Sequence, residues 1–160
     1  MVILGAMASV SAGLILRASD AYTRGATGAQ LVGELSTGLD RIDRELRRIG
    51  RKGAGAVAPN ISSITSSSIT WNTNWSLTFS GGQVLFSEGG STPVALLRDV
   101  SAFSVSAFNE SDATLALPLA GAACDPVRRL SVSVTLSRNG QTESLRTKIF
   151  LRSTLAGVLP

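Results

Sequence analysis

Two different hydrophobic patterns follow one another in the first fifty residues. Residues 1–16 carry no charged side chain and are apolar on every face of a helix. Further on, the apolar residues recur every three or four positions, at Leu31, Leu35, Leu39, Ile42, Leu46 and Ile49. This is the spacing of one helical face. Because no proline precedes Gly50, the pattern predicts one continuous helix, apolar all round over residues 1–16 and amphipathic over residues 17–52.

The polar face of this predicted helix alternates acidic and basic residues. Asp40 stands one turn before Arg44, and Asp43 one turn before Arg47, the order in which oppositely charged side chains support a helix. Acidic residues interleave with the arginines up to Lys52, and no aromatic residue accompanies them. We therefore expect a solvated helix face here rather than a nucleic-acid-binding surface.

The rest of the chain favours strands. Residues 53–68 are rich in small and polar residues and are expected to form a linker. Short β-favouring runs follow, with glycine, proline, asparagine and serine clusters between them: ITWNTNWSLTF, QVLFS, PVALL, VSAFSVSAF, RRLSVSVTL and ESLRTKIFL. Residues 69–160 are therefore expected to form an antiparallel β-sheet domain, with a hairpin turn at residues 80–82 and a long loop over residues 109–126.

Asn139-Gly140 is the clearest turn signal, because a type I′ turn needs positive φ at both central residues. A two-residue loop there pairs Arg138 with Gln141, and the same register places Val134 opposite Leu145. One face of this hairpin is then apolar and the other carries serines and basic residues, so the apolar face needs a cover. The predicted fold class is α+β, a long N-terminal helix packed on one C-terminal antiparallel sheet. Helix-to-sheet packing is assigned to Leu31, Leu35, Leu39, Ile42, Leu46 and Ile49.

The chain has few of the side chains that usually carry out catalysis or bind metal ions. Its 160 residues include no histidine and a single cysteine, Cys124, next to Asp125. Histidine is the commonest general base and metal ligand, and a neighbouring carboxylate disfavours a thiolate. Asp99, Glu110, Asp112 and Asp125 follow no recognised calcium-loop spacing. We therefore expect no enzymatic activity, no metal site and no cofactor.

The order of these elements resembles that of the type IV pilin-like proteins. MVILGAMASVSAGLIL is similar to the middle of the N-terminal helix in that family. LDRIDRELRRIG, ITW…LTFSGGQVLF, ALLRDVSAFSVSAF and VRRLSVSVTLSRNGQTESLRTKIFLRS resemble minor pilins and pseudopilins of the J or W type. The family's cleavage motif, resembling GFTLxE, is missing from the sequence. Two explanations stay open. Either the start codon is misplaced and the motif lies upstream of Met1, with about ten further apolar residues that complete a membrane span, or the chain is a truncated gene product.

The resemblance implies a structural subunit that primes filament assembly or contacts cargo at the filament tip. It implies a single pass through the bacterial inner membrane, with the C-terminal domain in the periplasm or outside the cell. The implied partners are other pilin or pseudopilin subunits, the inner-membrane assembly platform and lipid, with no nucleic acid and no small-molecule substrate. A type IV pilus, a type II secretion pseudopilus and a DNA-uptake fibre all stay open. The membrane and assembly helix is assigned to Met1, Val2, Ile3, Leu4, Met7, Val10, Leu14, Ile15 and Leu16.

A second class of protein also fits the sequence. Val10, Ser11 and Ala12 have the small side chains that a signal peptidase prefers. The alternative is therefore a secreted β-rich binding protein whose N-terminal signal segment is cut after Ala12. The mature N-terminus separates this alternative from a retained helix.

Overall fold

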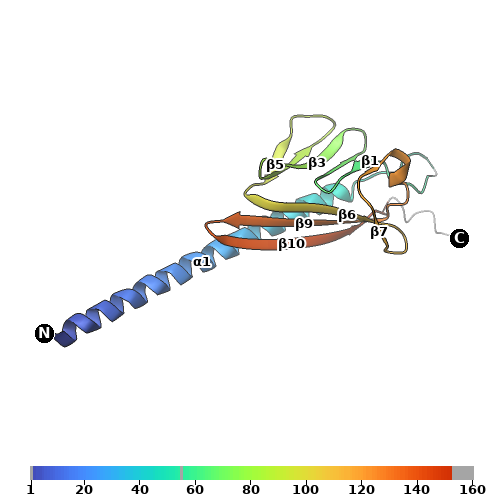
Figure 1. Cartoon of the computed structure of the whole chain (residues 1–160). Coiled ribbons are helices and arrows are strands. Elements are labelled where there is room, and N and C mark those ends of the chain that lie inside the picture. Colours follow the sequence, from blue (N-terminus) through green and yellow to red (C-terminus); the bar gives the residue numbers. More distant parts are fainter. Residues whose placement is uncertain (1, 55, 153–160) are drawn as a thin grey trace.

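The computed structural model (Figure 1) describes the backbone of residues 2–54 and 56–152 and the side chains of residues 17–19, 21–54 and 56–152. Helix α1 (Val2–Leu46) runs without a break through all its glycines. It ends before the predicted boundary at residue 52. Asn72 closes this end of the helix: its side-chain amide donates to the Arg48 carbonyl oxygen at 2.8 Å, and its Oδ1 accepts from the Gly50 N–H at 2.9 Å. These bonds satisfy backbone groups that a helix end leaves without partners.

The strands form two antiparallel sheets. The first has the order β5-β4-β3-β2-β1-β8, and the second has the order β10-β9-β6-β7. The strands of the first sheet are β1 (Ile61–Ile64), β2 (Ser68–Trp71), β3 (Trp75–Ser80), β4 (Gln83–Ser87), β5 (Val94–Leu97) and β8 (Leu119–Ala120). Those of the second are β6 (Val100–Phe108), β7 (Thr114–Leu115), β9 (Arg129–Arg138) and β10 (Gln141–Phe150). The short 3₁₀ helix η1 (Gly121–Cys124) follows β8.

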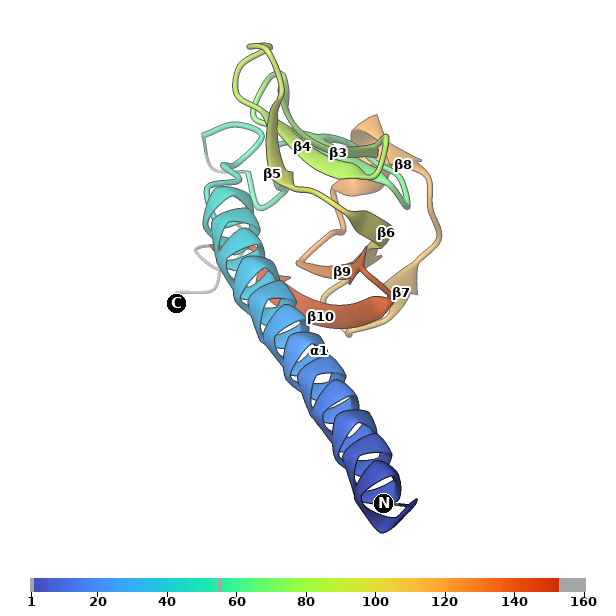
Figure 2. The same cartoon turned by 90° about the vertical axis from the view of Figure 1, so that its left-hand side faces the viewer.

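The predicted fold class, a long helix on one C-terminal antiparallel sheet, is wrong. Strand makes up 43% of the residues whose side chains are described, more than any helix, and the strands divide between two sheets. Helix α1 packs against them through contacts with β9 and β10 of one sheet and β5 of the other. Figure 2 shows the helix passing in front of β10 and lying beside β5.

The division between the sheets occurs at Asp99. Consecutive strands usually pair, which is why a single meander was expected. Asp99, between β5 and β6, has a positive φ of 56°, and the chain changes direction there. Its carbonyl oxygen accepts from the Ser137 N–H at 2.9 Å, and the next residue, Val100, donates to the Gly82 carbonyl at 2.9 Å. β6 therefore leaves β5 and pairs with β9 instead.

Three further predictions about segments are corrected. The expected linker over residues 53–68 contains β1 and pairs with both β2 and β8. The run ITWNTNWSLTF is two strands, because Asn72, Thr73 and Asn74 all adopt positive φ and reverse the chain between β2 and β3. The expected loop over residues 109–126 contains β7, β8 and η1.

Both predicted hairpin turns are confirmed. Asn139 and Gly140 have φ values of 52° and 75°, as a type I′ turn requires. Arg138 pairs with Gln141, Val134 with Leu145 and Leu130 with Ile149, which is the predicted register. The turn at Gly81-Gly82 likewise pairs Ser80 with Gln83.

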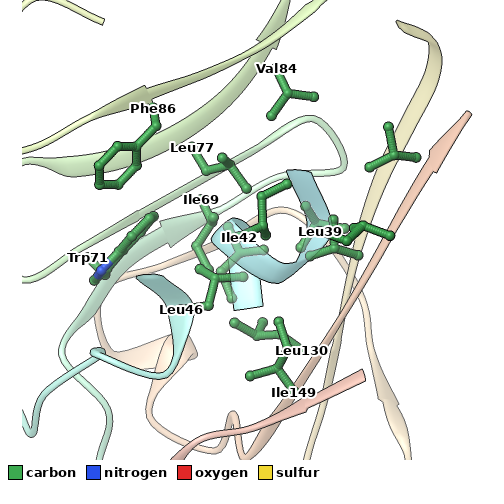
Figure 3. Close-up of a cluster of buried hydrophobic side chains, with 14 of the residues drawn as sticks. Leu39, Ile42, Leu46, Ile69, Trp71, Leu77, Val84, Phe86, Leu130 and Ile149 are labelled. Atoms are coloured by element: carbon green, nitrogen blue, oxygen red, sulfur yellow. The ribbon is translucent and has the colours of Figure 1, made fainter. Parts of the chain in front are cut away.

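A single hydrophobic core lies where the helix meets the two sheets (Figure 3). Leu39, Ile42 and Leu46 of α1 lie between side chains of the first sheet and side chains of the second. Trp71, Ile69 and Leu77 come from the first sheet, and Leu130 and Ile149 from the second. The helix therefore fills the space between the sheets, and burial of apolar surface there holds the three layers together.

Candidate functional site

The six residues assigned to helix packing lie in the core, but they contact two sheets rather than one. Leu31, Leu35, Leu39, Ile42, Leu46 and Ile49 are each at most 6% exposed. The spacing of the first five places them along one side of α1, which is continuous with the interior of the domain, and Ile49 follows the end of the helix. The second half of the helix is thus an integral part of the folded domain.

The helix in front of Leu31 projects away from both sheets (Figures 1 and 2). The described side chains of residues 17–30 are exposed apart from half-buried Thr27 and Gly28. Tyr22 is 80% exposed. The nine residues assigned to the membrane and assembly helix, within residues 1–16, lie outside the residues whose side chains are described. Among the described side chains, residues 17–19 and 21–26 are therefore open to whatever surrounds the helix.

Arg138 connects three parts of the domain at the point where the helix leaves it. This residue ends β9, and its guanidinium donates to both carboxylate oxygens of Glu34 on α1, at 3.0 and 2.8 Å. Its Nε donates to Asp99 Oδ2 at 2.7 Å. The hydrogen bonds that Arg138 donates to Glu34, and then to Asp99, raise the pKa of Arg138, and the bond that Glu34 accepts from Arg138 lowers the pKa of Glu34. A bidentate pair of this geometry fixes orientation as well as charge.

The Glu34 pair gives a pH-dependent contribution to stability. A carboxylate whose folded-state pKa is lowered stabilises the fold above its unfolded pKa and loses this contribution as the pH falls through the folded pKa. We expect the wild-type melting temperature to fall as the pH drops from about 5 to 3. Glu34→Gln should reduce the slope over this range. Thermal melts across that range test this, and an unchanged slope in the variant would contradict it.

Glu45 is a buried carboxylate close to the end of α1. Its side chain is 3% exposed and lies 2.8 Å from Arg41 Nε and 3.0 Å from Arg48 Nη1. The Arg48 guanidinium also lies 5.1 Å from the centre of the Trp75 ring. Two half-exposed arginines therefore neutralise one buried acid, and one of them, Arg48, also covers the Trp75 ring.

The acidic residues considered as metal ligands mostly face cations of the chain itself. Asp112 lies 2.8 Å from both Arg129 Nη1 and Lys148 Nζ, and these hydrogen bonds lower its pKa. Asp125 pairs with Lys52 at 2.9 Å. No group of three or more possible metal ligands occurs among the described residues.

Cys124, the other reactive candidate, is fully buried in η1. Burial, followed by the charge of Asp125, raises the pKa of its thiol. A raised pKa and the absence of solvent access both keep a thiol protonated and unreactive. Cys124 therefore serves as a small apolar core residue.

The chain matches no protein-family model, no curated protein and no solved structure. Within the part of the chain whose side chains are described, no helical segment is long and apolar enough to cross a membrane. Sequence reasoning missed Glu34, Arg138 and buried Glu45. Of these three residues, only Glu45 could have been assigned an ion-pair partner from nearby sequence, because it stands one helical turn after Arg41.

Proposed function

We propose that this chain is a minor pilin or pseudopilin, a structural subunit of a type IV pilus or a type II secretion pseudopilus. Its N-terminal helix holds it in the bacterial inner membrane, with the β-domain on the periplasmic or outer side, and then packs among the helices of neighbouring subunits. The observation that carries the proposal is the projecting first part of α1, whose described side chains from residue 17 to 26 (except residue 20) are all exposed.

The composition of the projecting helix supports both environments. Residues 1–16 are apolar on every side, so lipid and a bundle of other helices can each cover them. A helix of this composition can therefore move from one to the other at small cost.

The attachment of the helix to the domain supports a structural role. One face of residues 31–49, formed by Leu31, Leu35, Leu39, Ile42, Leu46 and Ile49, is buried in the core, and Arg138 ties Glu34 to the strands where the helix emerges. A helix held in this way transmits the position of one subunit to the next. The β-domain then supplies the surface that faces neighbours or cargo.

Replacing Leu14 with aspartate tests the proposal. A carboxylate in an apolar environment costs several kcal/mol, so the variant should leave the membrane fraction and form no intersubunit cross-links in cells. The matched control is Val57→Asp, which places the same charge on an exposed valine of the domain, 43% exposed, and should change neither readout. Normal membrane retention and normal filaments in Leu14→Asp would contradict the proposal.

The mature N-terminus separates this function from a secreted binding protein. A retained subunit keeps residues 1–16, whereas the secreted alternative begins at Gly13 after cleavage behind Ala12. Intact-mass spectrometry of the chain purified from cells measures this directly. A mature chain starting at Gly13 would overturn the membrane role.

A further inference from the structure

An open groove of about 920 Å³ lies between the second half of α1 and the end of the first sheet. One side is formed by helix residues between Gly33 and Arg44, and the other by Ala95 to Arg98. Arg138 also lines it. Figure 2 shows β5 next to α1, which it contacts.

The groove is unusually rich in arginine, with four arginines against two carboxylates. Two of the arginines are already paired within the domain. Arg138 is held by Glu34 at 2.8 Å, and Arg41 pairs with Glu45 at 2.8 Å. These two guanidinium groups line the groove, but carboxylates of the domain already neutralise them, so they contribute little to the binding of a ligand.

The other two arginines, Arg44 and Arg98, are exposed, and neither forms an ion pair with any residue that the structure describes. The predicted pair of Asp40 with Arg44 does not form, although Asp43 and Arg47 do pair, at 2.6 Å. Arg44 comes from the helix and Arg98 from the sheet side. Two available guanidinium groups thus line opposite sides of one groove, where they match an acidic ligand.

The sheet side of the groove also contains an unpaired strand edge, because Ala95, Leu96 and Leu97 of β5 line it. β5 is the last strand of its sheet and pairs only with β4 among the described residues. An edge strand carries a row of backbone N–H and C=O groups that can accept a further strand. Val94, at the start of β5, is 63% exposed and offers an apolar contact at the same edge.

We propose that this groove binds an extended acidic segment of another protein. The segment adds as a strand to the free edge of β5, and its carboxylates pair with Arg44 and Arg98. Backbone hydrogen bonds provide affinity and the two arginines provide selectivity for acidic side chains. This site is separate from the projecting part of α1 in front of Leu31, and the inference does not depend on what surrounds that part.

Fluorescence anisotropy with the full chain in a nonionic detergent tests the proposal. The probe is a fluorescein-labelled peptide of alternating threonine and glutamate, and the comparison peptide has lysine in place of glutamate. We expect the glutamate peptide to bind at least about tenfold more tightly than the lysine peptide. Absence of saturable binding, or equal binding of both peptides, would overturn the proposal.

Variants locate the binding site. Arg44→Glu combined with Arg98→Glu should weaken binding of the glutamate peptide by about tenfold or more. Arg146→Glu makes the same change at an exposed arginine of β10 and should stay within about twofold. Equal weakening by Arg146→Glu would show general charge attraction instead of a site. Circular dichroism verifies that each variant is folded.

A third peptide tests strand addition itself. Methylating alternate backbone nitrogens of the glutamate peptide removes the N–H groups that would pair with β5 and leaves its charge unchanged. We expect this peptide to bind at least about tenfold more weakly. Unchanged binding would overturn the pairing with the β5 edge.

Discussion

Replacing Trp71 with alanine is expected to lower the free energy of unfolding by about 3–5 kcal/mol, among the largest effects of any single substitution in this domain. Trp71 is fully buried, and its ring centre lies 6.4 Å from that of Trp75 and 6.2 Å from that of Phe86. Removing the ring leaves a cavity that its neighbours fill only in part. Urea unfolding followed by far-ultraviolet circular dichroism measures the loss.

Trp71→Phe is the informative companion to this variant. The indole Nε1 of Trp71 is buried and has no hydrogen-bond partner among the residues that the structure describes, and a buried donor of that kind carries a desolvation penalty. Phenylalanine keeps most of the ring and removes the penalty, so the expected loss is about 1 kcal/mol or less. Tyr22→Ala, at an exposed position of α1, should change stability by less than about 0.5 kcal/mol. Equal losses for Trp71→Phe and Trp71→Ala would contradict this account.

The features of the fold that sequence reasoning predicted are those fixed by neighbouring residues. The spacing of Leu31, Leu35 and Leu39 predicts a buried helix face because residues three and four apart share one side. Asn139-Gly140 predicts the register of β9 and β10 because the turn alone determines which residues pair. Both features depend on a few consecutive positions.

The division into two sheets depends on long-range pairing, and the prediction of one sheet failed for this reason. β6 pairs with β9 across the segment that contains β7, β8 and η1, and β1 pairs with β8 across more than fifty residues of chain. The change of direction at Asp99 depends on one residue with positive φ, which asparagine and aspartate tolerate but do not require. No local pattern specifies these choices.

The ion pairs also divide into those that neighbouring residues predict and those that depend on the fold. The pair of Asp43 with Arg47 was predictable from one-turn spacing and is present. Arg138 and Glu34 lie 104 positions apart in the sequence, and only the folded hairpin brings them together. The sequence did not predict the two arginines of the groove that lack an ion pair among the described residues. Arg44 was expected to pair with Asp40, and Arg98 comes from a distant part of the chain.

Two glycines of α1 should respond to alanine with opposite signs. A Cβ at Gly38 would lie 2.6 Å from Leu97 Cγ and 2.8 Å from Leu97 Cδ1, and Leu97 is itself buried. Overpacking of this kind costs about 1–3 kcal/mol, which exceeds the gain of about 1 kcal/mol in helix propensity. Gly38→Ala should therefore destabilise the domain by about 1–2 kcal/mol.

Gly33 is the matched control for this variant. A Cβ there meets no atom within 4 Å, so Gly33→Ala should stabilise the domain by up to about 1 kcal/mol. Repeating Gly38→Ala in a Leu97→Ala background removes the crowding, and the substitution should then become stabilising as well. Urea unfolding of the four variants gives the comparison. If Gly38→Ala stays destabilising without the Leu97 side chain, the close approach of α1 to β5 is not what requires glycine at this position.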